Sequence, residues 1–259
     1  ILVFMMRLCF GCQWQLKPND DDAAANVSVA RYDRIESLYL TTGDYSALQQ
    51  MNTYFPMQTR TLIEDMLHIG KVDDPETNSR FYRFFQDSTL QRMLVDVQHE
   101  FADMDDINED MASAFERLQD EMPALEIPHI YAQIGSFDQS IIVADGSLGI
   151  SLDKYLGSDY PFYRQNYSER QRRMMVRSMI VPDCLAFYLL SLYPIPLELV
   201  NTQKGRDLHM SKIQWVVNEV TEREVFQSDL ISAVDHYMKN NRSKSFDDML
   251  RSSSKTIFK

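Results

Sequence analysis

The spacing of apolar residues changes along the chain, and this change limits the folds that the sequence can adopt. From residue 31 to residue 122, apolar side chains recur every three or four positions, as they do in amphipathic helices. Residues 127–152 instead contain alternating or short continuous apolar runs, which are typical of strands. Helical spacing returns in residues 167–250. We therefore expect an α+β fold that is mostly helical, with a small β-sheet packed on the helices.

Three short segments make up the expected sheet. Residues 127–134 alternate apolar and other side chains, and residues 141–144 are a continuous apolar run. The pair Asp145-Gly146 is a turn signal. Residues 149–152 are either a third strand or a turn of helix.

Local signals place the ends of several helices. Asp44 and Ser245 are positioned to cap short helices. A long helix is predicted to start at Tyr167 or Ser168, and Pro182 is expected to kink it. The other helices are predicted at residues 31–42, 57–69, 88–103, 108–122, 207–217, 220–238 and 246–250.

The composition narrows the classes of partner. The net charge of −12 argues against nucleic acid, because phosphate recognition requires clustered Lys and Arg. The same charge argues against broad electrostatic docking to an anionic membrane. The length suits one large core, so we expect residues 29–259 to form a single α+β domain after a leader and tether at residues 1–28.

The leader has features of a lipid-anchored protein. Residues 1–12 are apolar except for Arg7, end in Cys12 after a glycine, and are followed by acidic residues 20–22. This pattern resembles a bacterial lipoprotein signal, so Cys12 is the predicted lipidation site, although Arg7 and Cys9 depart from the usual pattern. The run is shorter than the roughly 20 residues of a membrane span, so we expect membrane attachment through a lipid anchor only.

The segment after the expected strands is rich in aspartate and tyrosine. Its aspartates could bind calcium, but their spacing matches no EF-hand, and turn capping accounts for them more simply. Its tyrosines either line a groove for a partner or pack the loop onto the next helix. The candidate binding surface consists of Asp145, Asp153, Tyr155, Asp159, Tyr160, Asp183 and His209.

The next helix is the test for metallopeptidase chemistry. In zincins, a helix at this place carries two histidines at i and i+4 that bind zinc, with a glutamate that activates water. Residues 170–190 contain no histidine, and Asp183 is the only acid there. Cys184 lies among apolar residues and is expected to be a buried, inert thiol. We therefore predict no catalytic residue, no metal ligand and no cofactor, although a site built from His209 and distant acids stays open.

Several segments together are similar to one protein family. Residues 141–163, 168–190, 208–220 and 234–250 resemble the GldB-like gliding-motility lipoproteins of the Bacteroidetes. The resemblance implies a cell-envelope lipoprotein of the outer membrane, linked in some relatives to surface motility and its secretion machinery. The same family is similar to predicted zincin-type proteases. Residues 179–183 stand near the place of their metal motif, so the resemblance implies a degenerate zincin-like core.

These observations support one leading hypothesis and two alternatives. The leading hypothesis is a non-catalytic envelope lipoprotein, not an enzyme, that acts through contacts with other envelope proteins. The first alternative is a zinc-dependent metallopeptidase with an unrecognised ligand set that includes His209 and Asp183. The second is a peptide- or glycan-binding module that uses the tyrosine-rich loop after residue 152.

Overall fold

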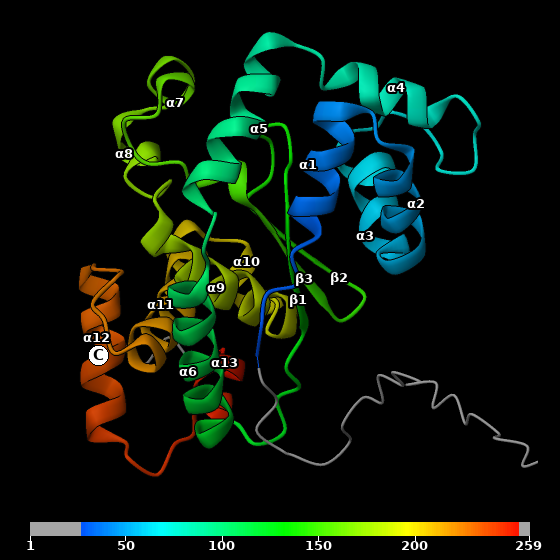
Figure 1. Ribbon diagram of the computed structural model, residues 1–259. Helices are drawn as coiled ribbons and strands as arrows, with labels where there is room; N and C mark the ends of the chain where they lie inside the picture. Colours follow the sequence, from blue (N-terminus) through cyan, green and yellow to red (C-terminus); the bar gives the residue numbers. More distant parts are fainter. Residues whose placement is uncertain (1–26, 254–259) are drawn as a thin grey trace, which may run out of the picture.

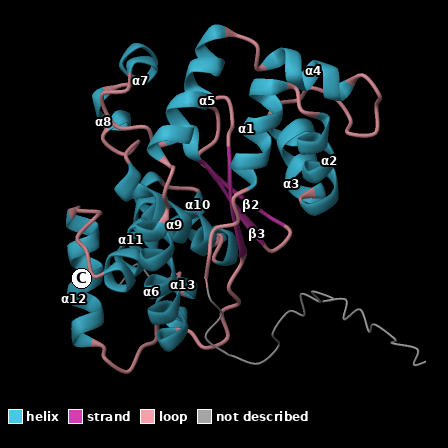
Figure 2. Ribbon diagram, viewed as in Figure 1, coloured by secondary structure: helices cyan, strands magenta, loops and turns pink. Residues whose placement is uncertain are grey.

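A small sheet lies between two groups of helices. The computed structural model describes residues 27–253. Figure 1 shows the three strands at the centre, with α1–α5 on one side and α6 together with α9–α13 on the other. Figure 2 shows how strongly helix predominates over strand. The predicted α+β class, mostly helical with a small sheet, is confirmed, while the likeness to a zincin core stays a prediction.

The sheet combines parallel and antiparallel pairing. Its strands are β1 (His129–Gln133), β2 (Ile141–Ala144) and β3 (Ser147–Ser151), in the spatial order β1-β3-β2. Strands β1 and β3 are parallel, whereas β2 and β3 form an antiparallel hairpin. Asp145 and Gly146 turn this hairpin with φ angles of 48° and 71°, as two-residue hairpin turns require.

The third segment of the predicted sheet is a strand followed by a short helix. Strand β3 leads directly into a 3-10 helix at Leu152–Lys154. Both predicted alternatives therefore occur, one after the other. In the register of the parallel pair, Gly149 lies opposite Tyr131, and a Cβ at position 149 would come within 2.6 Å of the tyrosine ring. A glycine is needed there because the ring covers the strand at close range.

The helices before the sheet follow the predicted order, with one difference. A single regular helix was predicted at residues 57–69, and this prediction is wrong. The segment is a short α-helix, α3, followed directly by a π-helix. Asp44 and Asp87 cap α2 and α5 by accepting backbone N–H groups. The elements are α1 (Tyr32–Thr42), α2 (Tyr45–Tyr54), α3 (Pro56–Arg60), the π-helix Thr61–Met66, α4 (Thr77–Phe84), α5 (Ser88–Glu100) and α6 (Asp105–Glu121).

The helices after the sheet correct two predictions. The long helix expected from Tyr167 or Ser168 is interrupted after Arg172 and resumes at Ile180. Pro182 does not kink it, because it lies in the first turn of α9, where the missing N–H has no partner to lose. The elements are α7 (Pro161–Asn166), α8 (Glu169–Arg172), the 3-10 turn Arg177–Met179, α9 (Ile180–Leu192), α10 (Leu197–Val200), α11 (Gln203–Thr221), α12 (Asp229–Asn240) and α13 (Phe246–Arg251).

The second correction concerns the pair of helices predicted at residues 207–217 and 220–238. The first is longer than expected and ends at Thr221, and the second starts only at Asp229. Glu222, with a φ of 52°, ends α11 in the left-handed region and turns the chain into a loop. The apolar spacing across residues 220–228 predicted a helix, but residues 222–228 form a loop between α11 and α12.

The core is continuous across both groups of helices. Helix α1 packs against β1, and α9 packs against β2 and β3. The buried apolar side chains form one cluster that extends from Val27 to Leu250. Most of the predicted leader, residues 1–28, lies outside the described residues, and so does Cys12.

Candidate functional site

The carboxyl ends of the two parallel strands meet at one edge of the sheet. Gln133 at the end of β1 lies beside Ser151 at the end of β3. The chain leaves these strands through residues 134–138 and 152–154. Ligand sites of open parallel sheets lie outside the carboxyl ends of the strands, so this edge is the place to examine.

Asp153 binds the backbone of the loop that leaves β1. Its carboxylate accepts the N–H groups of Gly135 at 2.6 Å and of Phe137 at 2.7 Å, and the side chain is fully buried. Burial raises the pKa of Asp153, while the two N–H groups and Lys154 oppose this rise. Phe137 has a φ of 63°, so the carboxylate holds the loop in a backbone conformation that a phenylalanine rarely adopts.

Lys154 binds the carbonyl groups of the same loop. Its ammonium donates to the oxygens of Phe137 at 2.9 Å and Asp138 at 3.2 Å, and to the Tyr167 hydroxyl at 3.1 Å. It also lies 4.6 Å from the centre of the Tyr167 ring, within the range of a cation–π contact. Consecutive side chains of opposite charge thus satisfy the N–H groups and the carbonyl groups of one loop.

Aromatic side chains cover this loop from the other side. The rings of Phe137 and Phe162 stack at 3.9 Å, and Tyr163 meets Tyr160 edge-on at 5.0 Å. Tyr163 donates to the carbonyl oxygen of Asp153 and is itself fully buried. Tyr160 donates to a carboxylate oxygen of Asp96 on α5 at 3.0 Å. The tyrosines therefore pack the loop against its neighbours.

Asp183 lies in the first turn of α9. It accepts a hydrogen bond from the Tyr155 hydroxyl at 2.9 Å. Burial raises the pKa of Asp183 to about 6, and the bond from Tyr155 opposes that rise. Within the described part of the chain, the hydrogen-bond partner of this half-buried acid is the buried side chain of Tyr155. Cys184 follows Asp183, buried, with a pKa that burial raises well above its ordinary value.

Glu36 brings a further carboxyl group to the same edge from α1. It is fully buried, and one of its oxygens accepts the N–H of Ile134 at 2.8 Å. Burial raises the pKa of Glu36 well above its ordinary value, and the charges of Asp33 and Asp153 raise it further. The other oxygen has no partner among the described residues, and the same is true of the side-chain oxygen of Gln133. Protonation of Glu36 would provide a donor at this place.

The sequence analysis missed Glu36, Gln133 and Lys154. Glu36 could have been found, because it follows Tyr32 by four residues and precedes Leu40 by four, which places a carboxyl group on the apolar face of a helix. Gln133 and Lys154 give no comparable signal, since polar residues at strand ends are normally exposed.

The structure brings together four of the seven residues of the candidate binding surface. Asp153, Tyr155, Tyr160 and Asp183 belong to the layer described above, but Asp153 and Tyr155 are buried rather than on a surface. Asp159 is exposed at its rim, 3.7 Å from Arg172. The two remaining residues, Asp145 and His209, lie elsewhere.

Asp145 and His209 take no part in this layer. Asp145 is exposed in the β2–β3 turn. His209 is buried in α11, where a ring nitrogen lies 2.7 Å from the carbonyl oxygen of Tyr193. Burial lowers the pKa of His209, which favours a neutral ring. His209 and Asp183 thus have separate partners and do not form a common site.

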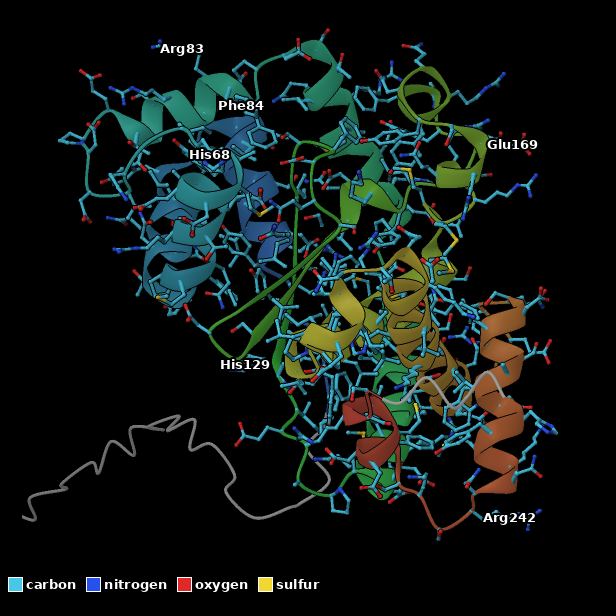
Figure 3. All side chains as sticks on the ribbon, turned by 180° about the vertical axis from the view of Figure 1, so that it is seen from behind. His68, Arg83, Phe84, His129, Glu169 and Arg242 are labelled. Atoms are coloured by element: carbon cyan, nitrogen blue, oxygen red, sulfur yellow. The ribbon has the colours of Figure 1, made fainter. Side chains whose placement is uncertain are left out.

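The described residues contain no group of three or more His, Cys, Asp or Glu side chains placed to hold a metal ion. Figure 3 shows His68 and His129 on separate parts of the molecule, and both side chains are exposed. The part of the chain that the structure describes also has no helix that is long and apolar enough to cross a membrane.

The fold and this edge define a helical α+β protein in which a buried layer of acids and tyrosines fastens loops and helices to a small mixed sheet. A sequence model of gliding motility protein GldB matches residues 13–213, which is more than half of the chain. The chain therefore belongs to the GldB family, whose members are gliding-motility-associated lipoproteins of the cell envelope. No curated protein and no solved structure matched the chain significantly.

Proposed function

We propose that this protein is a non-catalytic lipoprotein, anchored in the outer membrane through Cys12, that acts by contacts with other envelope proteins of the motility or secretion machinery. Membership of the GldB family supports the association with motility and with the envelope. The outer membrane, the anchor and the contact role are our proposals.

One observation carries the non-catalytic part of this proposal. The acids best placed for chemistry bind groups of the protein itself: Asp153 holds two backbone N–H groups, and Asp183 holds the Tyr155 hydroxyl. A general acid or base has to reach the proton that it transfers. Both side chains are already hydrogen-bonded within the fold, Asp153 fully buried and Asp183 half-buried, so they are better suited to shape the surface above them.

The proposal can be tested in a bacterium that carries the gene. Deletion is expected to reduce spreading on a surface, and the Asp183→Asn variant is expected to restore it as well as the unchanged protein. Asparagine still accepts the hydrogen bond from Tyr155 but provides no acid, base or anionic metal ligand. Normal spreading without the gene would refute the link to motility. Failure of a folded Asp183→Asn protein, present at the usual level, would refute the non-catalytic role.

The anchor has its own test. The Cys12→Ala variant is expected to leave the membrane fraction, because no helix among the described residues can span the bilayer. A Cys184→Ala variant is the matched control, since Cys184 is buried in the core and has no route to a lipid. Equal membrane association of both variants would contradict lipid attachment at Cys12.

A further inference from the structure

Helices α11 and α12 enclose a groove far from the acid–tyrosine layer. The loop between the helices, residues 222–228, closes one side of the groove, whose volume is about 870 Å³. Figure 1 shows the two helices side by side at the edge of the molecule, with α12 outermost. All of its lining residues lie between Trp215 and Lys239, beyond residues 13–213 that match the family. The groove is thus a feature of this chain that the family match does not cover.

The groove carries an excess of negative charge. Five acids line it, against two bases, Arg223 and Lys239. Arg223 is engaged by Asp110 of α6 at 3.0 Å, and Glu222 is engaged by Arg117 of α6 at 2.7 Å. These two ion pairs fasten the loop to α6 and so shape the groove.

Trp215 and Asp235 form one wall. The Trp215 side chain is 6% exposed, and its ring is held edge-on against Phe246 at 5.1 Å. Its indole N–H lies 3.4 Å from one carboxylate oxygen of Asp235, and the Lys239 ammonium lies 2.7 Å from the other. Lys239 is itself 72% exposed, and such surface ion pairs are weak. The contact with Lys239 shows that a cation fits against the Asp235 carboxylate. Because this ion pair is weak, we expect a cation of a ligand to be able to displace the Lys239 ammonium.

Glu219 lines the same groove from α11. Within the described part of the chain, its carboxylate forms no hydrogen bond or ion pair. Glu219 lies one helical turn after Trp215, on the same face of α11, and lines the groove together with Asp235. Burial raises the pKa of Glu219, and repulsion by the charge of Asp235 raises it further. A cation placed between them would remove this repulsion.

We propose that this groove binds a cationic segment of a partner protein, with an Arg or Lys side chain seated between Glu219 and Asp235 beside Trp215. The charge of the groove selects a basic ligand, and carboxylates beside an indole ring suit a guanidinium or ammonium group. Its volume falls in the range of ligand pockets, roughly 300–1,000 Å³, and exceeds the space that one side chain needs. The proposal rests on the contact role above only in taking the ligand to be a protein segment.

The experiment uses Trp215 as its own reporter. The full chain contains two tryptophans, so the Trp14→Phe variant leaves Trp215 as the only indole. This protein is titrated with a blocked decapeptide of alternating arginine and glycine, and separately with the same peptide in which glutamine replaces arginine. The arginine peptide is expected to change the Trp215 fluorescence saturably, and the glutamine peptide is not.

Three variants locate the binding. Glu219 is exposed and the Asp235 side chain is 33% exposed, so two ion pairs of moderate strength predict that Glu219→Gln with Asp235→Asn raises Kd about five-fold. Lys239→Gln removes the internal competitor and is expected to lower Kd about two-fold. The matched control is Asp65→Asn with Glu198→Gln, which removes the same charge from exposed helical positions outside the groove and is expected to leave Kd unchanged.

The outcomes are decisive in both directions. Absence of a saturable change, equal binding of the glutamine peptide, or equal weakening by the control pair would overturn the proposal. If circular dichroism shows that the double variant is unfolded, Lys239→Gln decides when it is compared with Lys71→Gln, which removes a similarly exposed positive charge outside the groove: a cation site at Asp235 predicts tighter binding to Lys239→Gln than to Lys71→Gln, and equal binding would overturn the proposal. Motility and fractionation do not enter this assay, so the failure of the groove and the failure of the proposed function are distinguishable.

Discussion

At the scale of single residues, Asp153 shows what the buried acids contribute. A buried backbone N–H without a partner is costly, and the loop that leaves β1 presents two of them at positions 135 and 137. One carboxylate satisfies both. The preceding strand and the following Lys154 bring the carboxylate to that place, so the local sequence Asp153-Lys154 determines the shape of a loop 16 residues earlier in the chain.

Replacing Asp153 by alanine is therefore expected to destabilise the protein strongly. It leaves two buried N–H groups unpaired, which costs about 3 kcal/mol or more of the free energy of unfolding. Urea denaturation measures this, with Asp138→Ala as the control: Asp138 lies in the same loop but its side chain is exposed, so a change below about 0.5 kcal/mol is expected. Similar losses for both variants would contradict the role given to Asp153.

Asp183 predicts a dependence of stability on pH. Its pKa is about 6 in the folded protein against an ordinary value of 3.8, so the fold favours its protonated form. The stabilisation by protonation is complete below pH 3.8 and is lost as the pH rises through 6. Asparagine cannot ionise. The stability of Asp183→Asn relative to the unchanged protein should therefore rise with pH, by up to about 3 kcal/mol for a shift of about two units.

Urea denaturation at low and at neutral pH, on both proteins, measures this difference. Groups other than Asp183 titrate in both proteins and cancel in the comparison. A difference in stability that stays constant across the pH range would show that Asp183 does not have a raised pKa.

At the scale of elements, the sequence predicts the helices whose ends carry local signals. Asp44 and Ser245 cap helices as expected, because capping depends on residues within one turn. Pro182 misled the prediction, since a proline in a long apolar run is compatible with a kink and also with a helix start. Arg177, which follows the break after Arg172, makes tertiary contacts with Asp106 and Glu100 that the local sequence pattern does not contain.

The candidate site shows the same difference between local signals, which the sequence reveals, and tertiary contacts, which it does not. Asp153, Tyr155, Tyr160 and Asp183 were recognised as chemically notable from their residue types, and the structure brings them together. The burial of Asp153 and Tyr155 was not predicted, because it depends on which helices cover the loop. Glu36 comes from a distant helix, and its position beside the loop follows only from the packing of α1 on β1.

The capping box of α13 gives a prediction at this scale. Ser245 accepts the N–H of Asp248 at 3.1 Å, and Asp248 in return accepts the N–H of Ser245 at 3.3 Å. Ser245→Ala is expected to cost about 1 kcal/mol of the free energy of unfolding. Chemical denaturation in the Trp14→Phe background, followed by Trp215 fluorescence, reports it, because Phe246 of α13 packs on that ring. Ser243→Ala, at an exposed turn position, should have no measurable effect; an equal effect would argue against the cap.

At the scale of the whole molecule, Arg177 connects segments that are far apart in the sequence. Its guanidinium donates to both carboxylate oxygens of Asp106, at 2.9 and 2.6 Å, and to the carbonyl oxygens of Glu100 and Asp103. It also lies 5.2 Å from the centre of the Phe101 ring. Arg177 thereby ties the short turn before α9 to the connection between α5 and α6. These two helices belong to the two groups that lie on opposite sides of the sheet.

Removal of this connection is expected to weaken the whole fold. Arg177→Ala should cost about 2 kcal/mol, because several charge-assisted hydrogen bonds are lost from a site that is only partly exposed. Thermal unfolding followed by circular dichroism measures the loss. Arg173→Ala is the control, since its ion pair with Glu169 is exposed and contributes little. A Tm for Arg177→Ala equal to that of the control would contradict this account.

The molecule as a whole is an acidic α+β protein of the GldB family with a buried polar layer at its centre and a charged groove at its edge. We propose that the buried layer is structural and that the protein performs no metal-dependent peptide cleavage. The most direct test is the zinc content of the purified full chain, together with its cleavage of unstructured protein substrates with and without a chelator. We predict less than stoichiometric zinc and no chelator-sensitive cleavage; one bound zinc per chain with cleavage that the chelator abolishes would contradict the claim.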